Sequence, residues 1–141
     1  MVPAETRLRV GVDAVEVARL ERLLAEHPDS PGEIFTAREL AYCAAKKRSG
    51  EHLAARFAAK EAVLKAFGTG VSRRLRLTEV EVVNDDDGRP QINLDGAAAT
   101  YARRHGLAEI DVSLTHTRQI AIANVVSRWR PPGTATACAS T

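Results

Sequence analysis

Apolar and polar positions alternate with a period of two near the start of the chain. The apolar members of this pattern are Leu8, Val10 and Val12. Successive side chains of a strand point to opposite sides, so this alternation is typical of a strand with one buried face. We therefore expect a half-buried strand that ends at Asp13.

The next segment has the spacing of an amphipathic helix. Apolar residues between Val15 and Leu24 form one stripe, and the charged residues among them face outward. The segment 27–32, HPDSPG, contains proline and glycine and ends this pattern. We expect a helix from about Ala14 to Glu26, followed by a break.

Two further helices are predicted before the middle of the chain. Thr36 and Glu39 have the spacing of a capping box, in which the threonine side chain accepts from the third helical amide and the glutamate reaches back. The box predicts a short helix over 37–47. A longer helix is expected over 51–67, because the helical pattern continues there as far as Gly68.

The period of two returns in the second half of the chain. Two strands are expected on either side of the turn segment 84–90, NDDDGRP, and a helix is then expected to end at Gly106. Two more strands follow over about 110–115 and 120–126. The Pro, Gly, Thr and Ala content of the end of the chain predicts a disordered tail over 129–141.

Helices early and antiparallel strands late define the fold class as α+β, with an antiparallel sheet packed against helices. The length of 141 residues suits one domain, expected over 1–128. The net charge is +2, and basic residues are interleaved with acidic ones, so a nucleic-acid partner is not expected. A mildly basic surface still suits an acidic macromolecule or a polyphosphate.

Cysteine usage and hydropathy indicate the compartment. Cys43 and Cys138 have neither metal-ligand spacing nor the pattern of a disulfide framework. The chain has no apolar run long enough to span a membrane, and its first residues lack the features of a secretion signal. We expect a cytoplasmic protein without a membrane partner.

The segment 56–68, RFAAKEAVLKAFG, has the most informative charges. Glu61 and Lys65 lie one helical turn apart, and Arg56 and Lys60 form a second polar stripe, with alanines that leave room for a ligand. The alternative is a solvated helix on which the Glu–Lys pair contributes only about 0.2–0.5 kcal/mol. Spacing alone favours that alternative.

Asp13 points toward a functional site. A carboxylate at the end of a buried strand is costly without a partner or a metal, although Asp13 is equally well placed to cap the following helix. Asp13 and Glu61 together would supply oxygen ligands for Mg²⁺, which takes one or two carboxylates plus substrate phosphate. Two carboxylates with adjacent lysines therefore suit a diphosphate ligand.

His116 lies at the turn between the last two predicted strands, after Thr115. A histidine in such a turn is more often a surface residue, yet Ser113, Thr115 and His116 would also form a polar edge for phosphate. The glycine-rich stretch 68–70 follows a helix instead of preceding one. It is therefore expected to end that helix, not to form an anion site at a helix N-terminus.

Four separated motifs resemble one family. They are VGVD at 10–13, FTARE at 35–39, RFAAKEAVLKAFG at 56–68 and SLTH at 113–116. In this order and spacing, from about Leu8 to Val126, the chain resembles the 4′-phosphopantetheinyl transferases of the holo-acyl-carrier-protein synthase type. The resemblance implies the fold of that family and, for its short members, a homotrimer that binds coenzyme A between subunits.

The resemblance also implies an activity. The enzyme would move 4′-phosphopantetheine from coenzyme A to a serine of an apo acyl carrier protein of a fatty acid or polyketide synthase, releasing 3′,5′-ADP. Asp13 and Glu61 would hold Mg²⁺ and, with Lys65, form the catalytic set, in which Glu61 is the candidate acceptor of the serine proton. The alternative is a non-catalytic module that binds coenzyme A or the carrier protein.

Further contacts follow from the same resemblance. The residues expected to bind coenzyme A are Arg56, Lys60, Lys65, Gly68, Thr115 and His116. Arg56 and His116 would hold the adenosine 3′-phosphate end, and His116 would reach across from the adjacent subunit. Arg19 and Arg22, on the outward face of the first helix, would receive acidic residues of the carrier protein.

Overall fold

The computed structural model describes residues 5–68 and 74–131. Its elements in chain order are β1 (Arg7–Glu16), α1 (Val17–Glu26), α2 (Ser30–Ile34), α3 (Ala37–Ala44), α4 (Ser49–Phe67), the 3-10 turn η1 (Leu77–Glu79), β2 (Val80–Asn84), β3 (Pro90–Leu94), α5 (Gly96–His105), β4 (Leu107–His116) and β5 (Ile120–Trp129). Within these ranges no helix is both long and apolar enough to cross a membrane.

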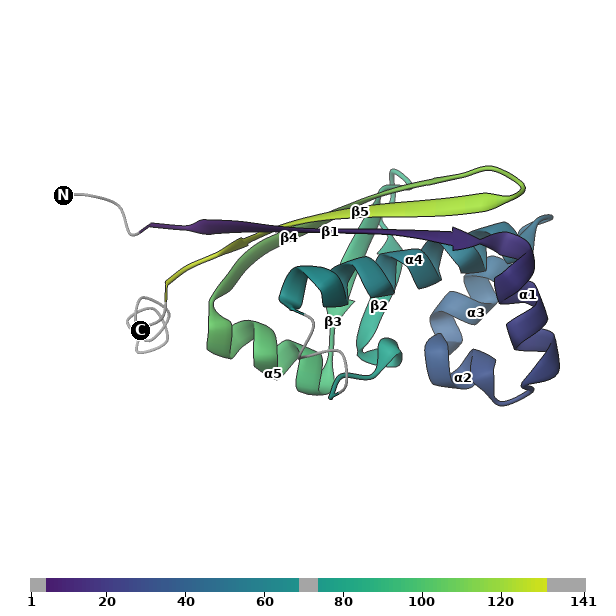
Figure 1. Ribbon diagram of the computed structural model, residues 1–141, viewed down its shortest axis with the longest axis horizontal. Helices are drawn as coiled ribbons and strands as arrows, with labels where there is room; N and C mark the ends of the chain where they lie inside the picture. Colours follow the sequence, from purple (N-terminus) through teal and green to yellow (C-terminus); the bar gives the residue numbers. More distant parts are fainter. Residues whose placement is uncertain (1–4, 69–73, 132–141) are drawn as a thin grey trace.

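The strands form two antiparallel sheets. The larger sheet has the order β1-β5-β4, and β2 and β3 form a separate hairpin. Helix α4 runs along one face of the larger sheet, α1, α2 and α3 gather near one end of α4, and α5 lies toward the other end (Figure 1). The predicted α+β class is therefore confirmed.

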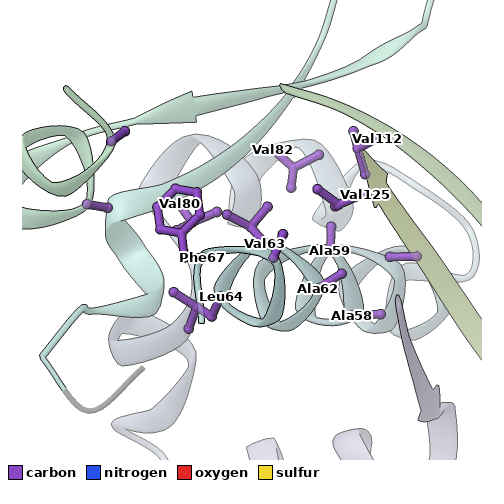
Figure 2. Close-up of a cluster of buried hydrophobic side chains, with 14 of the residues drawn as sticks. Ala58, Ala59, Ala62, Val63, Leu64, Phe67, Val80, Val82, Val112 and Val125 are labelled. Atoms are coloured by element: carbon purple, nitrogen blue, oxygen red, sulfur yellow. The ribbon is translucent and has the colours of Figure 1, made fainter. Parts of the chain in front are cut away.

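Small residues let α4 approach the larger sheet closely. A Cβ atom added at Gly11 would lie 1.9 Å from the carbonyl oxygen of Ala62, so only glycine permits this contact. The alanines of α4 are buried in the same core as valines of the strands (Figure 2). These alanines are Ala58, Ala59, Ala62 and Ala66. The prediction that they leave room for a ligand is wrong, because the protein core fills the space beside them.

Strand β1 alternates as predicted, but its apolar side chains face away from the core. Leu8 and Val10 are each 67% exposed and Val12 is 59% exposed, whereas Gly11 on the other side is buried. The alternation shows that β1 has two different faces, but it does not show which of them packs against α4. Together with exposed apolar residues of β5, these side chains form the outer sheet face, made of Leu8, Val10, Val12, Ile120, Ile122 and Val126.

Several boundaries differ from the sequence prediction. Strand β1 continues past Asp13 to Glu16, and α2 occupies part of the predicted break, where Pro31 is tolerated in the first turn because that turn leaves its N–H unused. Trp129 ends β5 and is buried, with its ring 5.3 Å from that of Phe67. The predicted tail boundary is therefore wrong at Trp129, and the rest of that tail from residue 132 lies outside the described residues.

The predicted capping box is present at the start of α3. The Glu39 amide donates to Thr36 Oγ1 at 3.2 Å, and the Thr36 amide donates to Glu39 Oε1 at 2.9 Å. The same glutamate is almost completely buried, which a cap on a surface helix does not require. Its additional contacts connect the fold to the functional site.

Candidate functional site

A groove of about 570 Å³ opens between the end of β1, helix α1 and helix α4. The charged residues that line it are Asp13, Glu16, Arg19, Arg22, Glu26 and Glu61. The groove therefore contains both predicted metal ligands and both residues predicted to receive the carrier protein, although Asp13 and Glu61 are far apart in the sequence.

The close packing at Gly11 places Asp13 beside α4. Asp13 lies two residues after Gly11 and so points to the same side of β1. Lys65 Nζ donates to Asp13 Oδ1 at 2.9 Å and to the carbonyl oxygen of Val12 at 3.1 Å. Lys65 remains 52% exposed, so its ammonium group is available at the surface beside the two carboxylates.

Glu61 lies in a negative environment. Burial raises the pKa of Glu61, the Asp13 carboxylate raises it further, and Lys65 opposes both effects. One lysine thus faces two carboxylates, and the resulting excess of negative charge favours a bound cation or proton. A titratable group shifted in this way within a groove is a feature of functional sites.

Two arginines of α1 form the rim of the groove. Arg19 and Arg22 are exposed and line it, and the partly exposed Leu23 lies beside them. Positive charge next to an apolar side chain suits an acidic protein surface. The rim faces solvent, unlike the carboxylates deeper in the groove.

Lys60 does not reach the groove. Its side chain is 0% exposed, and Nζ donates to Glu39 Oε1 at 2.6 Å, to the Val80 carbonyl at 2.7 Å and to the Leu77 carbonyl at 3.0 Å. Burial lowers the pKa of Lys60, and the Glu39 carboxylate opposes that shift. The predicted contact between Lys60 and coenzyme A is contradicted, because all three ammonium hydrogens are already used inside the protein.

Arg56 is also buried, on the side of α4 that faces α3 and β2. Its guanidinium carbon lies 4.2 Å from the ring centroid of Tyr42, and Nη2 donates to Asn84 Oδ1 at 2.6 Å. Its Nε atom finds no hydrogen-bond partner among residues 5–68 and 74–131. Arg56 is 3% exposed, so in the isolated chain its side chain contacts Tyr42 and Asn84 and not solvent.

His116 belongs to the same region as Arg56. Its Nδ1 atom lies 3.0 Å from Glu51 Oε1, and its ring centroid is 5.1 Å from that of His52. Burial lowers the pKa of His52, and the neighbouring His116, Lys46 and Arg56 lower it further. Neither Arg56 nor His116 lines the groove of Asp13 and Glu61, so the chain has two separate polar regions.

Thr115 and Gly68 lie neither in the groove of Asp13 and Glu61 nor beside Arg56. Thr115 is exposed and pairs with Ile122, so it lies on the outer sheet face, opposite to the side chain of His116. Gly68 has φ 128° and donates its N–H to the Leu64 carbonyl at 3.0 Å. It ends α4 as predicted, and positions 69 and 70 lie outside the described residues.

The sequence interpretation missed the partners of the buried cations. Glu39 was assigned only to the capping box, and the stacking of Tyr42 on Arg56 was not expected. One signal was available for Lys60. It lies among alanines that face the core, and a charge in that position requires a buried partner.

The metal-binding capacity of the groove depends on its two carboxylates. Among the residues that the structure describes, no group of three or more His, Cys, Asp and Glu side chains is arranged to hold a metal ion. Asp13 and Glu61 alone are a small ligand set, which suits an ion that takes its remaining ligands from water and a bound phosphate.

The chain has an α+β fold with antiparallel sheets, in which Asp13 and Glu61 line one groove, and the sequence comparison shows to which family it belongs. The family model described as the 4′-phosphopantetheinyl transferase superfamily matches residues 9–125. The chain belongs to this superfamily, and the resemblance based on four motifs is confirmed.

Three individual proteins of this kind are similar to the chain over most of its length. The chain is 45% identical over 116 residues to a holo-[acyl-carrier-protein] synthase of Moorella thermoacetica, covering 82% of this chain and 90% of that one. The ACPS–CoA complex of Chronobacterium ammoniagenes matches with a TM-score of 0.79 and 28% identity, covering 88% and 98% of the two chains. A Bacillus anthracis holo-(acyl-carrier-protein) synthase in complex with CoA (3′,5′-ADP) matches with a TM-score of 0.69 and 32% identity, covering 86% and 96%.

Proposed function

We propose that this chain transfers the 4′-phosphopantetheine group from coenzyme A to a serine of an apo acyl carrier protein and releases 3′,5′-ADP. The observation that carries the proposal is the meeting of Asp13 and Glu61 in one groove that Arg19 and Arg22 also line, with Lys65 paired to Asp13 beside it. The family membership and the coenzyme A complexes of related synthases support the choice of substrates.

The donor set of the groove fits Mg²⁺. Asp13 and Glu61 supply carboxylate oxygens, and burial and then the Asp13 carboxylate raise the pKa of Glu61 while Lys65 opposes both effects. When bound, the ion would supply charge neutralisation for the diphosphate of coenzyme A. Lys65, half exposed beside Asp13, would hold a phosphate oxygen at the surface.

The residues of the groove would act mainly by positioning. The serine oxygen forms a bond to the phosphorus nearest pantetheine while the bond from that phosphorus to the 3′,5′-ADP oxygen breaks. Glu61 would accept the serine proton directly or through a water, and its raised pKa suits a general base. No covalent intermediate with the enzyme is required, because oriented groups and charge neutralisation supply the main contributions.

Arg56 and His116 are proposed for the adenosine 3′-phosphate end. The Arg56 guanidinium is permanently charged and retains an unpaired Nε donor among the described residues, and the His116 ring lies in the same region beside His52. These residues do not line the groove of Asp13 and Glu61. We therefore expect coenzyme A to extend from the groove of one subunit to the partner subunit's His116, whereas the Thr115 side chain points to the other face of β4 and is not expected to contact it.

The outer sheet face supports a homotrimer. Several large apolar side chains of β1 and β5 are exposed there in the isolated chain, including Val10 and Val126, which pair in register. A contiguous exposed apolar surface of this kind marks an interaction site. Val10→Asp would place a charge at its centre, and light scattering should then detect monomers in place of trimers. A monomeric wild-type protein would contradict this part of the proposal.

A cytoplasmic location is part of the proposal. Cys43 is a free, buried thiol, which suits a reducing compartment. Carrier proteins of fatty acid or polyketide synthases would be the partners met there, and Arg19 and Arg22 would receive their acidic residues.

Mass spectrometry provides the direct test of transfer. Apo carriers from a fatty acid synthase and from a polyketide synthase are incubated with the protein, coenzyme A and Mg²⁺, and a gain of one phosphopantetheine per carrier is expected. Glu61→Gln and Asp13→Asn should abolish the gain while circular dichroism shows a folded chain. Coenzyme A binding without any carrier modification would instead indicate the non-catalytic module.

A further inference from the structure

One buried carboxylate joins three elements of the fold. Glu39 Oε1 accepts from the Thr36 amide at 2.9 Å and from Lys60 Nζ at 2.6 Å, and Glu39 Oε2 accepts from the Val82 amide at 2.8 Å. The same side chain thus completes the cap of α3, pairs with α4 and fastens β2. Both charged groups are fully excluded from solvent.

Lys60 extends this network into the chain that enters β2. Its remaining donors reach the carbonyls of Leu77 and Val80, at the start of the hairpin. One turn earlier on the same side of α4, Arg56 donates to Asn84 at the far end of β2. Helix α4 is therefore fastened to β2 at both ends of that strand.

Apolar packing also holds α4, since Val63, Leu64 and Phe67 lie in the core and the Phe67 ring is 5.3 Å from that of Trp129. The side that meets β1 is different, because it is built from alanine and the glycine at position 11, where the two backbones approach closely without large side chains between them. Directional hydrogen bonds to Glu39 and to two carbonyls define one position. A buried ion pair contributes little net stability compared with apolar packing, so its effect on geometry is the more informative property.

Glu61 follows Lys60 directly, and we propose that Lys60 is a positioning residue for the Glu61 carboxylate. By holding its turn of α4 against α3 and β2, Lys60 sets where Glu61 meets Asp13 across the groove. The inference rests on the proposed function of that groove. It also connects the FTARE and RFAAKEA motifs physically, because the glutamate of the first is the counterion of the lysine in the second.

The test uses the full chain with the double substitution Glu39→Gln and Lys60→Met. Glutamine has a single acceptor oxygen, so it keeps a bond to either the Thr36 or the Val82 amide but not to both, and the double substitution leaves no charge buried alone. Glu39→Gln alone is measured as well, so that the loss of this acceptor is separated from the loss of the lysine. Val112→Ala, in the core on β4, is the control that lowers stability without removing any hydrogen-bonding group of this network. Lys60→Met alone is measured beside them.

Two measurements are made well below the unfolding temperature of every variant. Mn²⁺, which binds the same type of oxygen donor, is titrated and the free ion is counted by electron paramagnetic resonance. Carrier modification gives kcat and KM. For the double variant we expect Mn²⁺ affinity and kcat to fall by about 10–100-fold, with KM for the carrier changed less than about twofold. Val112→Ala should leave both quantities unchanged.

The outcomes separate this inference from the proposed function. Wild-type Mn²⁺ affinity and kcat in the double variant, or equal losses in Val112→Ala, would overturn the positioning role. If the wild type modifies no carrier, the proposed function fails, and the Mn²⁺ titration alone decides the role of Lys60. A wild type that binds no Mn²⁺ overturns both.

Discussion

Lys60 and Glu61 are neighbours in the sequence, yet they lie in opposite electrostatic environments. Lys60 is fully buried, and its charge is matched by Glu39 at 2.6 Å. Glu61 faces a groove in which burial and then the Asp13 carboxylate raise its pKa, and Lys65 opposes the shift. The two sides of α4 thus differ in whether their charges are neutralised by the protein itself.

The difference shows how one helix combines two roles. On the inner side, charge and hydrogen bonds are satisfied within the fold, as expected of a group that fixes geometry. On the groove side, unmatched negative charge remains and costs stability until a cation or proton arrives. Substitutions on the two sides should therefore have effects of different size and, for Glu61, of opposite sign.

The largest expected effect is the loss of Lys60. Lys60→Met leaves the buried Glu39 carboxylate unpaired and should lower the free energy of unfolding by about 3–5 kcal/mol in urea denaturation. Lys65→Met is the matched control on the same helix, because Lys65 is also paired with a carboxylate but is 52% exposed. Lys65→Met should lower the free energy of unfolding by less than about 1 kcal/mol. Equal losses of stability in the two variants would contradict the claim that the two sides of α4 differ in how their charges are neutralised.

A smaller effect is expected where α4 meets β1. Gly11→Ala places a methyl group against the Ala62 carbonyl, forces the strand away from the helix and should cost about 1–3 kcal/mol. Asp13 would move with the strand, so carrier modification should fall as well. Gly32→Ala is the control, since no atom of the described part of the chain lies within 4 Å of its added Cβ. Thermal unfolding that ranks Gly32→Ala as the more damaging change would contradict the packing argument.

The smallest expected effect is an increase in stability, in contrast to the losses predicted above. Because the folded-state pKa of Glu61 is raised, its ionisation destabilises the fold at pH values above that pKa. Without metal, Glu61→Gln should therefore be more stable than the wild type near neutral pH, by less than about 1 kcal/mol. This gain should disappear as the pH falls through the folded pKa toward the ordinary carboxyl value.

Adding metal provides a second test of the environment of Glu61. Adding Mg²⁺ at neutral pH should raise the unfolding temperature of the wild type and leave that of Glu61→Gln nearly unchanged, because binding stabilises only the protein that holds the ion. A wild type that is more stable than Glu61→Gln without metal at every pH would contradict the environment assigned to Glu61.

The sequence predicted local features and motif residues well. The capping box at Thr36, the hairpin around 84–90 and the convergence of Asp13 with Glu61 all have signals of short range or fixed motif spacing. The inward side of β1 and the burial of Lys60 were not predictable in the same way. Both depend on which face of α4 meets the sheet, and α4 has charged residues on more than one side.

Cys43 offers an internal probe of the region around the Lys60 network. The thiol lies on α3, four residues after Glu39, and is 0% exposed, and burial raises its pKa. A protonated, enclosed sulfur reacts with alkylating reagents only when α3 lifts away from the protein. The rate at which iodoacetamide labels Cys43, followed by peptide mass analysis, therefore reports how often this part of the protein opens in solution.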